Sequence, residues 1–168
     1  MSEEVKREEK RVIIGGLVDT FYHTLDPKRR LTIPSEWRVA MGDPEYVYIF
    51  PDAKDECLDL VPMHEIKPLL DELRKADIFD SEADDMAQAL MQYAQMLKID
   101  ASGRIRVGDE LLDYAGINSK VTLVGGGLKA KLWAGEKMPQ KPKLDLTAFR
   151  AAIAKRKAAR EAANGGVL

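Results

Sequence analysis

The sequence predicts an α+β, β-rich fold built from two copies of one small unit, with a helical hairpin between the copies and a helix at the C-terminal end. Two observations carry this prediction: a motif that occurs twice, and a hydrophobic periodicity that changes from the alternation of strands to the spacing of helices. A length of 168 residues suffices for one ordinary domain or for two small units that share a core.

The duplication appears at an offset of 74 residues, which takes Asp26 to Asp100 and Arg30 to Arg104. The same offset pairs three further landmarks: Gly42 with Gly116, Val47 with Val121, and Ile49 with Leu123. Leu60 also corresponds to Leu132 once two residues are lost from the loop before it. One short match would be weak evidence, but agreement over about forty residues indicates a duplication.

Each copy opens with a strand, a turn and a second strand. Asp26 suits the turn because its side chain can accept hydrogen bonds from backbone N–H groups just ahead of it. In the strand that follows, Leu31 and Ile33 are predicted to point inward, and Arg30 and Thr32 outward. The second copy repeats the pattern around Asp100, with Ile105 and Val107 on one side and Arg104 and Arg106 on the other.

A short helix and two strands complete each copy. In the first copy Ser35 is the predicted N-cap, Trp37 and Met41 share one helix face, and Gly42 is a typical stop. Residues 109–116 repeat this helix in the second copy. The closing strands are predicted at 46–50 with 58–61, and at 120–124 with 129–133.

The helical hairpin lies between the copies. Its first helix starts at Pro62 and carries Ile66, Leu69, Leu70 and Leu73 at helical spacing. Because Pro68 would remove a helix hydrogen bond, this helix is expected to begin late or to kink there. Ser81 begins a capping sequence before the second helix, whose predicted apolar stripe is Met86, Leu90, Tyr93 and Leu97.

Charge is distributed unevenly along a chain whose formal net charge is −2. Acids greatly outnumber bases in residues 52–85, and we interpret them as the solvated faces of the two helices. Residues 137–160 are basic and include a predicted helix at 146–163. This basic tail could add non-specific DNA affinity, touch an anionic membrane or only solubilise the end of the chain.

These patterns divide the chain into five segments. They are a charged extension at 1–16, a first repeat at 17–62, the helical hairpin at 63–96, a second repeat at 97–138 and a basic helical tail at 139–168.

Composition favours a cytoplasmic protein. Cys57 is the one cysteine, so the chain cannot form an internal disulfide, which points to a reducing compartment. Residues 1–11 are charged and unlike a signal peptide, and no apolar run approaches the roughly 20 residues of a membrane-spanning helix.

Enzymatic chemistry finds little support in the sequence. His23 and His64 lack the spacing of metal ligands. Gly125-Gly126-Gly127 precedes Lys129, but Ala130 stands where a phosphate-binding loop has Ser or Thr, so a tight β-turn is predicted. We therefore expect no catalytic residue, cofactor, metal or small-molecule substrate.

With these residues laid out, the chain resembles the MraZ family of bacterial regulators, which carry two copies of a D-x-K-G-R-type motif. The matching segments are 23–34 (HTLDPKRRLTIP) and 100–104 (DASGR), supported by Pro62-Met63-His64-Glu65 and Leu132-Trp133. The likeness spans about Leu17 to Met138. Two motifs at the correct spacing and in the correct order make a fairly specific signal.

The chain departs from the family pattern at several positions. Arg29 stands where the family usually has glycine, Ser102 replaces the lysine that the first copy has at position 28, and Gly108 stands opposite Pro34. Asp19 and Tyr93 occupy the positions, seven residues before each motif, where the family commonly has glycine.

The resemblance implies two swapped-hairpin halves, of the kind found in AbrB-like transcription factors, that form one barrel. It implies a ring-shaped homo-oligomer that displays its motif loops on one face. It further implies binding to direct repeats of double-stranded promoter DNA in the division and cell-wall gene cluster, usually as a repressor, and hence a place in the nucleoid.

The residues themselves are consistent with DNA contact. Three consecutive cations on one turn cannot all be buried unpaired, and exposed arginine suits phosphate and bidentate guanine contacts. The predicted nucleic-acid contacts are Lys28, Arg29, Arg30, Arg104 and Arg106.

Other interpretations of these residues remain open. The cations could form only a solubilising loop, or Arg30 and Arg104 could pair with Asp26 or Asp100 and fix the turns; the two aspartates are expected to be structural. At the level of function, a ring could bind another protein through the acidic hairpin, with weak or non-specific DNA binding. A dimeric AbrB-like DNA binder or antitoxin partner is disfavoured, because one chain already supplies both halves.

Overall fold

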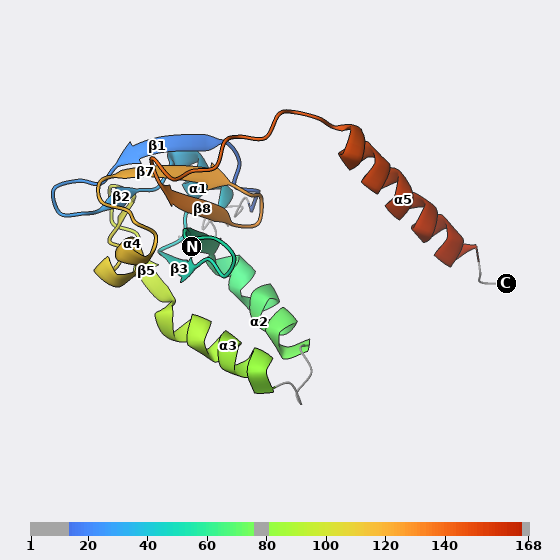
Figure 1. Ribbon diagram of the computed structural model, residues 1–168, viewed down its shortest axis with the longest axis horizontal. Helices are drawn as coiled ribbons and strands as arrows, with labels where there is room; N and C mark the ends of the chain where they lie inside the picture. The colour runs from blue at the N-terminus through green and yellow to red at the C-terminus, as the bar shows by residue number, and fades with distance from the viewer. Residues whose placement is uncertain (1–13, 76–80, 166–168) are drawn as a thin grey trace, which may run out of the picture. The chain divides into compact units, whose positions relative to one another are not determined.

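The structure is a computed structural model that describes residues 14–75 and 81–165, so the expected extension at 1–16 lies mostly outside the described residues. The chain forms two compact units, Met1–Met138 and Pro139–Leu168. The first is an α+β unit with antiparallel strands, and the second contains helix α5, Thr147–Asn164 (Figure 1). Among the described residues, no helix combines the length and apolar character needed to cross a membrane.

The first unit follows the predicted order of elements. The first copy contains β1 Thr20–Thr24, β2 Leu31–Thr32, α1 Ser35–Ala40, β3 Tyr46–Pro51 and β4 Leu58–Pro62. The hairpin contains the short 3-10 helix η2 Met63–Glu65, then α2 Ile66–Lys75 and α3 Ser81–Tyr93. The second copy contains β5 Gln95–Lys98, β6 Arg104–Ile105, α4 Asp109–Tyr114, β7 Lys120–Gly125 and β8 Ala130–Ala134. The four predicted closing strands are thus confirmed to within about a residue.

The six longer strands form one sheet in the order β1-β7-β8-β4-β3-β5. Each copy gives its first strand to the other copy: β1 pairs with β7, and β5 pairs with β3. The register follows the duplication, because Thr24 lies opposite Lys120 while Lys98, 74 residues after Thr24, lies opposite Tyr46. An approximate twofold axis therefore passes between β4 and β8, and the two copies exchange their first strands.

The sheet does not close into the predicted barrel. Within the described residues its hydrogen-bonded order ends at β1 on one side and at β5 on the other. The two-residue strands β2 and β6 pair with each other instead, with Leu31 opposite Ile105 and Thr32 opposite Arg104. Strands this short form a separate ladder and cannot bridge the two edges of the large sheet.

One hydrophobic core serves both ladders. Leu31 and Ile33 from the first copy and Ile105 and Val107 from the second are buried in it, which confirms the predicted alternation. Trp37 of α1 is also buried, and its indole N–H donates a hydrogen bond of 2.7 Å to the carbonyl of Val18. Because each copy contributes matching side chains, the core belongs to neither copy alone.

The helix ends correct one prediction and confirm another. Ser35 is the first residue of α1 and not its N-cap; Pro34 is the N-cap, and its carbonyl accepts hydrogen bonds from Trp37 and Arg38. Gly42 and Gly116 follow the two short helices with φ of +81° and +67°. This left-handed conformation is the one that glycine adopts readily at the end of a helix.

The hairpin also differs from expectation in one respect. Because α2 begins at Ile66, Pro68 falls in its first turn, where the missing N–H is tolerated; the helix begins late, as predicted. Leu97, however, does not continue the stripe of α3, because it lies in β5 opposite Val47. The edge of β3 offers hydrogen bonds to the chain, which leaves the helix after Tyr93 and joins the sheet.

Candidate nucleic-acid interface

The first motif turn is closed by the side chain and the backbone of Asp26. The Asp26 carbonyl accepts the Arg29 N–H at 2.8 Å, and the Asp26 N–H donates to the Arg30 carbonyl at 3.0 Å. The Asp26 carboxylate accepts the backbone N–H of Arg30 at 2.7 Å. This last bond contributes most to a lowering of the Asp26 pKa, so the aspartate is held as an anion.

The second motif turn has the same hydrogen bonds. The Asp100 carbonyl accepts the Gly103 N–H at 2.9 Å, and the Asp100 N–H donates to the Arg104 carbonyl at 3.0 Å. The carboxylate accepts the backbone N–H groups of Arg104 and Ser102, each at 2.9 Å. The Arg104 N–H is again the main cause of a lowered carboxyl pKa. Both aspartates therefore have the structural role that the sequence predicts for them.

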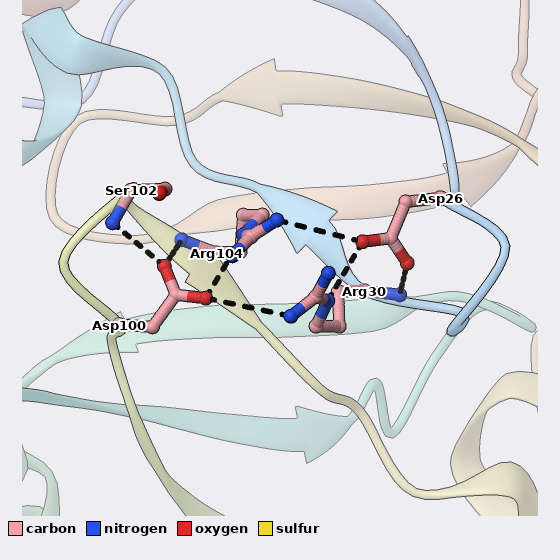
Figure 2. Close-up of polar contacts among 5 residues, drawn as sticks. All are labelled: Asp26, Arg30, Asp100, Ser102 and Arg104. Carbon is pink, nitrogen blue, oxygen red and sulfur yellow. Dashed lines mark hydrogen bonds and ion pairs between the residues drawn. The ribbon is translucent and has the colours of Figure 1, made fainter.

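Ion pairs join the two turns into a closed set of four residues, which we call the Asp–Arg quartet: Asp26, Arg30, Asp100 and Arg104 (Figure 2). Within each turn the arginine Nε lies close to the aspartate Oδ2, at 2.7 Å in the first copy and 2.9 Å in the second. Across the turns, Arg30 Nη1 lies 4.0 Å from Asp100 and Arg104 Nη1 lies 3.9 Å from Asp26. Arg30 and Arg104 thus fix the turns, and they keep 28% and 31% of their side chains exposed.

The two turns differ at one backbone position. Arg29 and Gly103 correspond in the duplication, and both are left-handed, with φ of +59° and +79°. The guanidinium of Arg38 covers Gly103, so a Cβ built there would lie 2.6 Å from Arg38 Cζ. The second turn therefore favours glycine for its conformation, and a Cβ there would also displace the flexible end of Arg38, whereas the first turn holds a side chain in a conformation unfavourable for it.

Asp109, at the start of α4, links the side chains of Arg29 and Arg106. Its Oδ1 atom pairs with Arg29 Nη1 and, at 2.9 Å, with Arg106 Nη2. The hydrogen bond from Arg106 is the main cause of a lowered Asp109 pKa, and the charge of Arg29 adds to it. Asp109 was not predicted from the sequence as a site residue. Its spacing from Arg106 was a possible signal, but its contact with Arg29, 80 residues away, had none.

The five predicted DNA contacts thus gather on two adjoining turns. Lys28 is exposed and forms no ion pair among the described residues. The other four are paired with Asp26, Asp100 and Asp109, so these five cations face three carboxylates and this set of residues has an excess of two positive charges. Such an arrangement can present oriented guanidinium N–H groups to an anion such as a phosphate.

The position of Asp19 explains one departure from the family pattern. Asp19 has φ of +74°, the backbone conformation that a glycine would supply there. Its carboxylate accepts the N–H of Thr20 at 2.7 Å, a local bond of the kind that makes aspartate one of the more tolerant residues in this conformation.

A second polar cluster lies away from the motif turns. Potential ligand atoms of the buried residues Asp52, Cys57 and Asp59 lie within 4.8 Å of one another. Their carboxylates are already paired with ammonium groups, Lys129 with Asp59 at 2.9 Å and Lys131 with Asp52 at 3.3 Å. Burial raises the pKa of the Cys57 thiol to about 12, so the thiolate that a metal requires is disfavoured. The cluster is better described as a buried ion-pair network than as a metal site.

No family model matches the chain. Several proteins named "Transcriptional regulator MraZ" are similar to it. The one from Clostridium acetobutylicum is 30% identical over 120 residues, which cover 71% of this chain and 82% of that protein. Those from Saccharophagus degradans and Methylocella silvestris are 31% and 32% identical, over 67% and 71% of this chain and 78% and 74% of theirs.

Proposed function

The chain belongs to the MraZ family of transcriptional regulators, and from this membership we propose that it regulates transcription by binding double-stranded DNA through its two motif turns. The family is one of regulators and not of enzymes. The observation that carries the proposal is the meeting of the two turns in the Asp–Arg quartet, which gathers the cations of both copies in one place.

Each cation has a distinct role in this proposal. Lys28, Arg29 and Arg106 contact phosphates, where a positive charge suffices. Arg30 and Arg104 are oriented by their aspartates and contact base edges. A guanidinium has five N–H donors, and the aspartates engage Nε and approach Nη1, so donors remain for a bidentate contact to guanine.

We further propose that the chain acts as a homo-oligomer, in the form of a ring, on promoter direct repeats of the division and cell-wall gene cluster. The outcome proposed is repression, in the nucleoid. The support is the family resemblance together with a physical argument: one chain offers a single pair of turns, and an excess of two charges binds DNA weakly. Several chains on repeated sites would gain from counterion release and from effective concentration.

The proposal also includes the division of the chain into repeats at 17–62 and 97–138 around the hairpin. The register of β1 on β7 and of β5 on β3 supports it, because both pairings follow the same offset.

The test is a titration of the full chain against the DNA upstream of its own gene and against a scrambled duplex, at two salt concentrations. We expect preferential binding to the natural duplex, weaker at the higher salt concentration, by at least about tenfold over the scrambled one. Light scattering on the same samples gives the oligomeric state and separates a ring from a dimer.

A matched pair of variants locates the interface. The triple change Lys28→Gln, Arg29→Gln and Arg106→Gln removes three cations near the motif turns, and the control Lys54→Gln, Lys67→Gln and Lys98→Gln removes three exposed cations elsewhere. We expect the first variant to lose most of its affinity and the control to keep it. Absence of any preference in the parent protein would favour the protein-interaction alternative, with α2 and α3 as the docking face.

A further inference from the structure

Helix α5 has no buried residue. All of its 18 residues, Thr147–Asn164, are exposed. Eight of the 18 are alanine, the strongest helix former, which explains how the helix can form without a hydrophobic contact. Its first turn is capped by Asp145, whose carboxylate accepts the N–H of Thr147 at 2.9 Å.

The charge of α5 is strongly positive. It carries five cations, Arg150, Lys155, Arg156, Lys157 and Arg160, against the single acid Glu161. No ion pair to these cations is found in the part of the chain that the structure describes. Arg156 and Arg160 are four residues apart and therefore adjacent on the helix, where like charges destabilise it. A polyanion would relieve this repulsion.

Four of the five cations lie on one side of the helix, and Lys155 lies on the other side. Phe149, Ile153, Arg156 and Arg160 are spaced by four, three and four residues, so they form one stripe, and Lys157 lies beside it. Most of the remaining surface is alanine. The stripe therefore begins with two exposed apolar side chains and ends in a compact group of three cations.

We propose that α5 is a second DNA-contacting element, which binds backbone phosphates without regard to sequence, beside the site that the motif turns contact. This inference rests on the proposed function, since it assumes that the chain binds DNA. The partner of α5 is DNA, because contact with backbone phosphates requires only well-placed cations.

The apolar surface of α5 is too small for the other partners. A protein interface of standard size buries about 800 Å² on each side and has an apolar core, and a membrane-surface helix needs a face of bulky apolar residues. Here Phe149 and Ile153, 62% and 51% exposed, are the only large apolar side chains on the helix.

The linker gives α5 sufficient reach. Residues 139–146 have no regular secondary structure, and eight extended residues span at most about 28 Å. The helix itself adds about 27 Å at 1.5 Å per residue. Linker and helix together therefore extend up to about 55 Å from residue 138, more than the roughly 34 Å of one turn of duplex. A tethered contact of this kind acts at a high effective concentration.

The experiment uses the full chain and two quadruple variants with the same change in charge. The tail variant is Lys155→Gln, Arg156→Gln, Lys157→Gln and Arg160→Gln, in which glutamine preserves helix propensity. The control is Lys54→Gln, Lys67→Gln, Lys75→Gln and Lys98→Gln, at exposed positions outside both proposed contacts. Affinity is measured for the upstream duplex and for the scrambled duplex over a series of salt concentrations, and circular dichroism monitors helix content.

The tail variant is expected to lose about 10- to 100-fold in affinity at low salt for both duplexes, with an unchanged ratio between them. The slope of log affinity against log salt should fall by roughly two to four, since each lost phosphate contact contributes about 0.9. The control should keep the parent's slope.

Equal slopes in the tail variant and the control would overturn the inference while leaving the proposed function intact. A tail variant that changes the oligomeric state by light scattering but keeps its salt slope would also overturn it, and would assign α5 to a second copy of the chain. If the parent shows no affinity for either duplex, the proposed function fails as well. A natural-to-scrambled ratio that is lost on Arg30→Ala, which removes a proposed base contact, but kept in the tail variant distinguishes the two contacts.

Discussion

At the scale of single residues, the motif turns show a conflict between backbone conformation and charge. Arg29 adopts the left-handed conformation that costs glycine nothing, and at the corresponding position of the second turn the chain has Gly103. Unlike the second turn, the first turn therefore carries a guanidinium at this position, and it forms an ion pair with Asp109. We infer that a cation is useful enough at this position to outweigh a strain of about 1 kcal/mol.

Two substitutions separate the strain from the charge. Arg29→Gly and Arg29→Ala both remove the cation and its ion pair, but only alanine keeps a Cβ in the left-handed conformation. We expect the glycine variant to be more stable than the alanine variant by about 1 kcal/mol in urea unfolding, and both to bind DNA equally weakly. If the alanine variant is as stable as the glycine variant, the turn is not left-handed at this residue.

The buried network of Asp52 and Asp59 contains one carboxylate that is easily protonated. Burial, together with the neighbouring charge of Asp52, raises the pKa of Asp59 to about 6, although Lys129 opposes the shift. Asp52 shifts in the other direction: burial alone would raise its pKa, but N–H groups of Asp55 and Lys54 and a hydrogen bond with Asp59 lower it. Below about pH 6 Asp59 is therefore protonated while Asp52 stays charged, and above it both are carboxylates.

This proton makes stability depend on pH. An aspartate titrates near 3.9 when unfolded, so between about pH 4 and pH 6 the folded state binds more protons and its stability falls as the pH rises. Asp59→Asn carries no titrating proton, and its free energy of unfolding should vary by about 2 kcal/mol less than the parent's between pH 4.5 and 7.5. The measurement is urea unfolding across this range.

The other carboxylates with shifted pKa values do not affect the comparison of the parent with Asp59→Asn between pH 4.5 and 7.5. The lowered pKa values of Asp26, Asp100 and Asp109 contribute stability that is present above about pH 4 and is lost only in more acidic solution. A parent and a variant with parallel pH profiles would show that Asp59 is charged throughout.

At the scale of elements, α1 is fixed to the sheet by one aromatic side chain. Trp37 is buried, donates to the carbonyl of Val18, and meets the ring of Phe21 edge-on with 5.5 Å between centroids. A six-residue helix has little stability of its own, so its position depends on such contacts.

Trp37→Phe tests this anchor. Phenylalanine keeps the apolar contact but leaves the Val18 carbonyl without its donor, and we expect a loss of about 1–3 kcal/mol in the free energy of unfolding. Val39→Ala, on the exposed side of the same helix, is the control and should change it by less than about 0.5 kcal/mol. Similar effects of both substitutions would contradict an anchoring role for Trp37.

Elements were easier to predict from the sequence than their partners. The closing strands, the stops at Gly42 and Gly116 and the turns at Asp26 and Asp100 all arise from patterns within a few residues, which periodicity and turn chemistry reveal. The pairing of β1 with β7 and the bridging role of Asp109 could not be predicted, because both join residues 80 or more apart. The contact of the Arg38 guanidinium with Gly103 could not be predicted either. Nor could the ends of the sheet at β1 and β5, which do not pair to close a barrel within the described residues.

At the scale of the whole molecule, the exchange of first strands makes each copy incomplete. In the first copy, β3 needs β5 of the second copy as its outer partner. In the second copy, β7 needs β1 of the first copy. The centre of the sheet is formed by β4 and β8, with Leu58 opposite Leu132 and Leu60 opposite Ala130, so this pairing also joins the two copies.

Separated halves should therefore fold only together. We expect fragments 1–94 and 95–168 each to lack cooperative unfolding by circular dichroism, and an equimolar mixture to recover the native spectrum. Each fragment alone at twice the concentration serves as the control. It excludes the possibility that the spectrum recovers because one fragment associates with itself. A first fragment that unfolds cooperatively by itself would contradict the interdependence of the copies.

The same exchange sets an order of events during protein synthesis. Thr20–Thr24 leaves the ribosome early, yet its partner Lys120–Gly125 is translated about a hundred residues later, some 5 to 20 seconds at ordinary elongation rates. Until then the nascent chain carries an unsatisfied strand whose hydrogen-bonding groups can pair with a strand of a neighbouring nascent chain. On a polysome several copies emerge side by side. There, β1 of one chain can pair with β7 of a neighbouring chain instead of with its own β7, and this pairing links two chains. Slow codons before position 125 should therefore increase the yield of intertwined dimers at the expense of correctly closed chains.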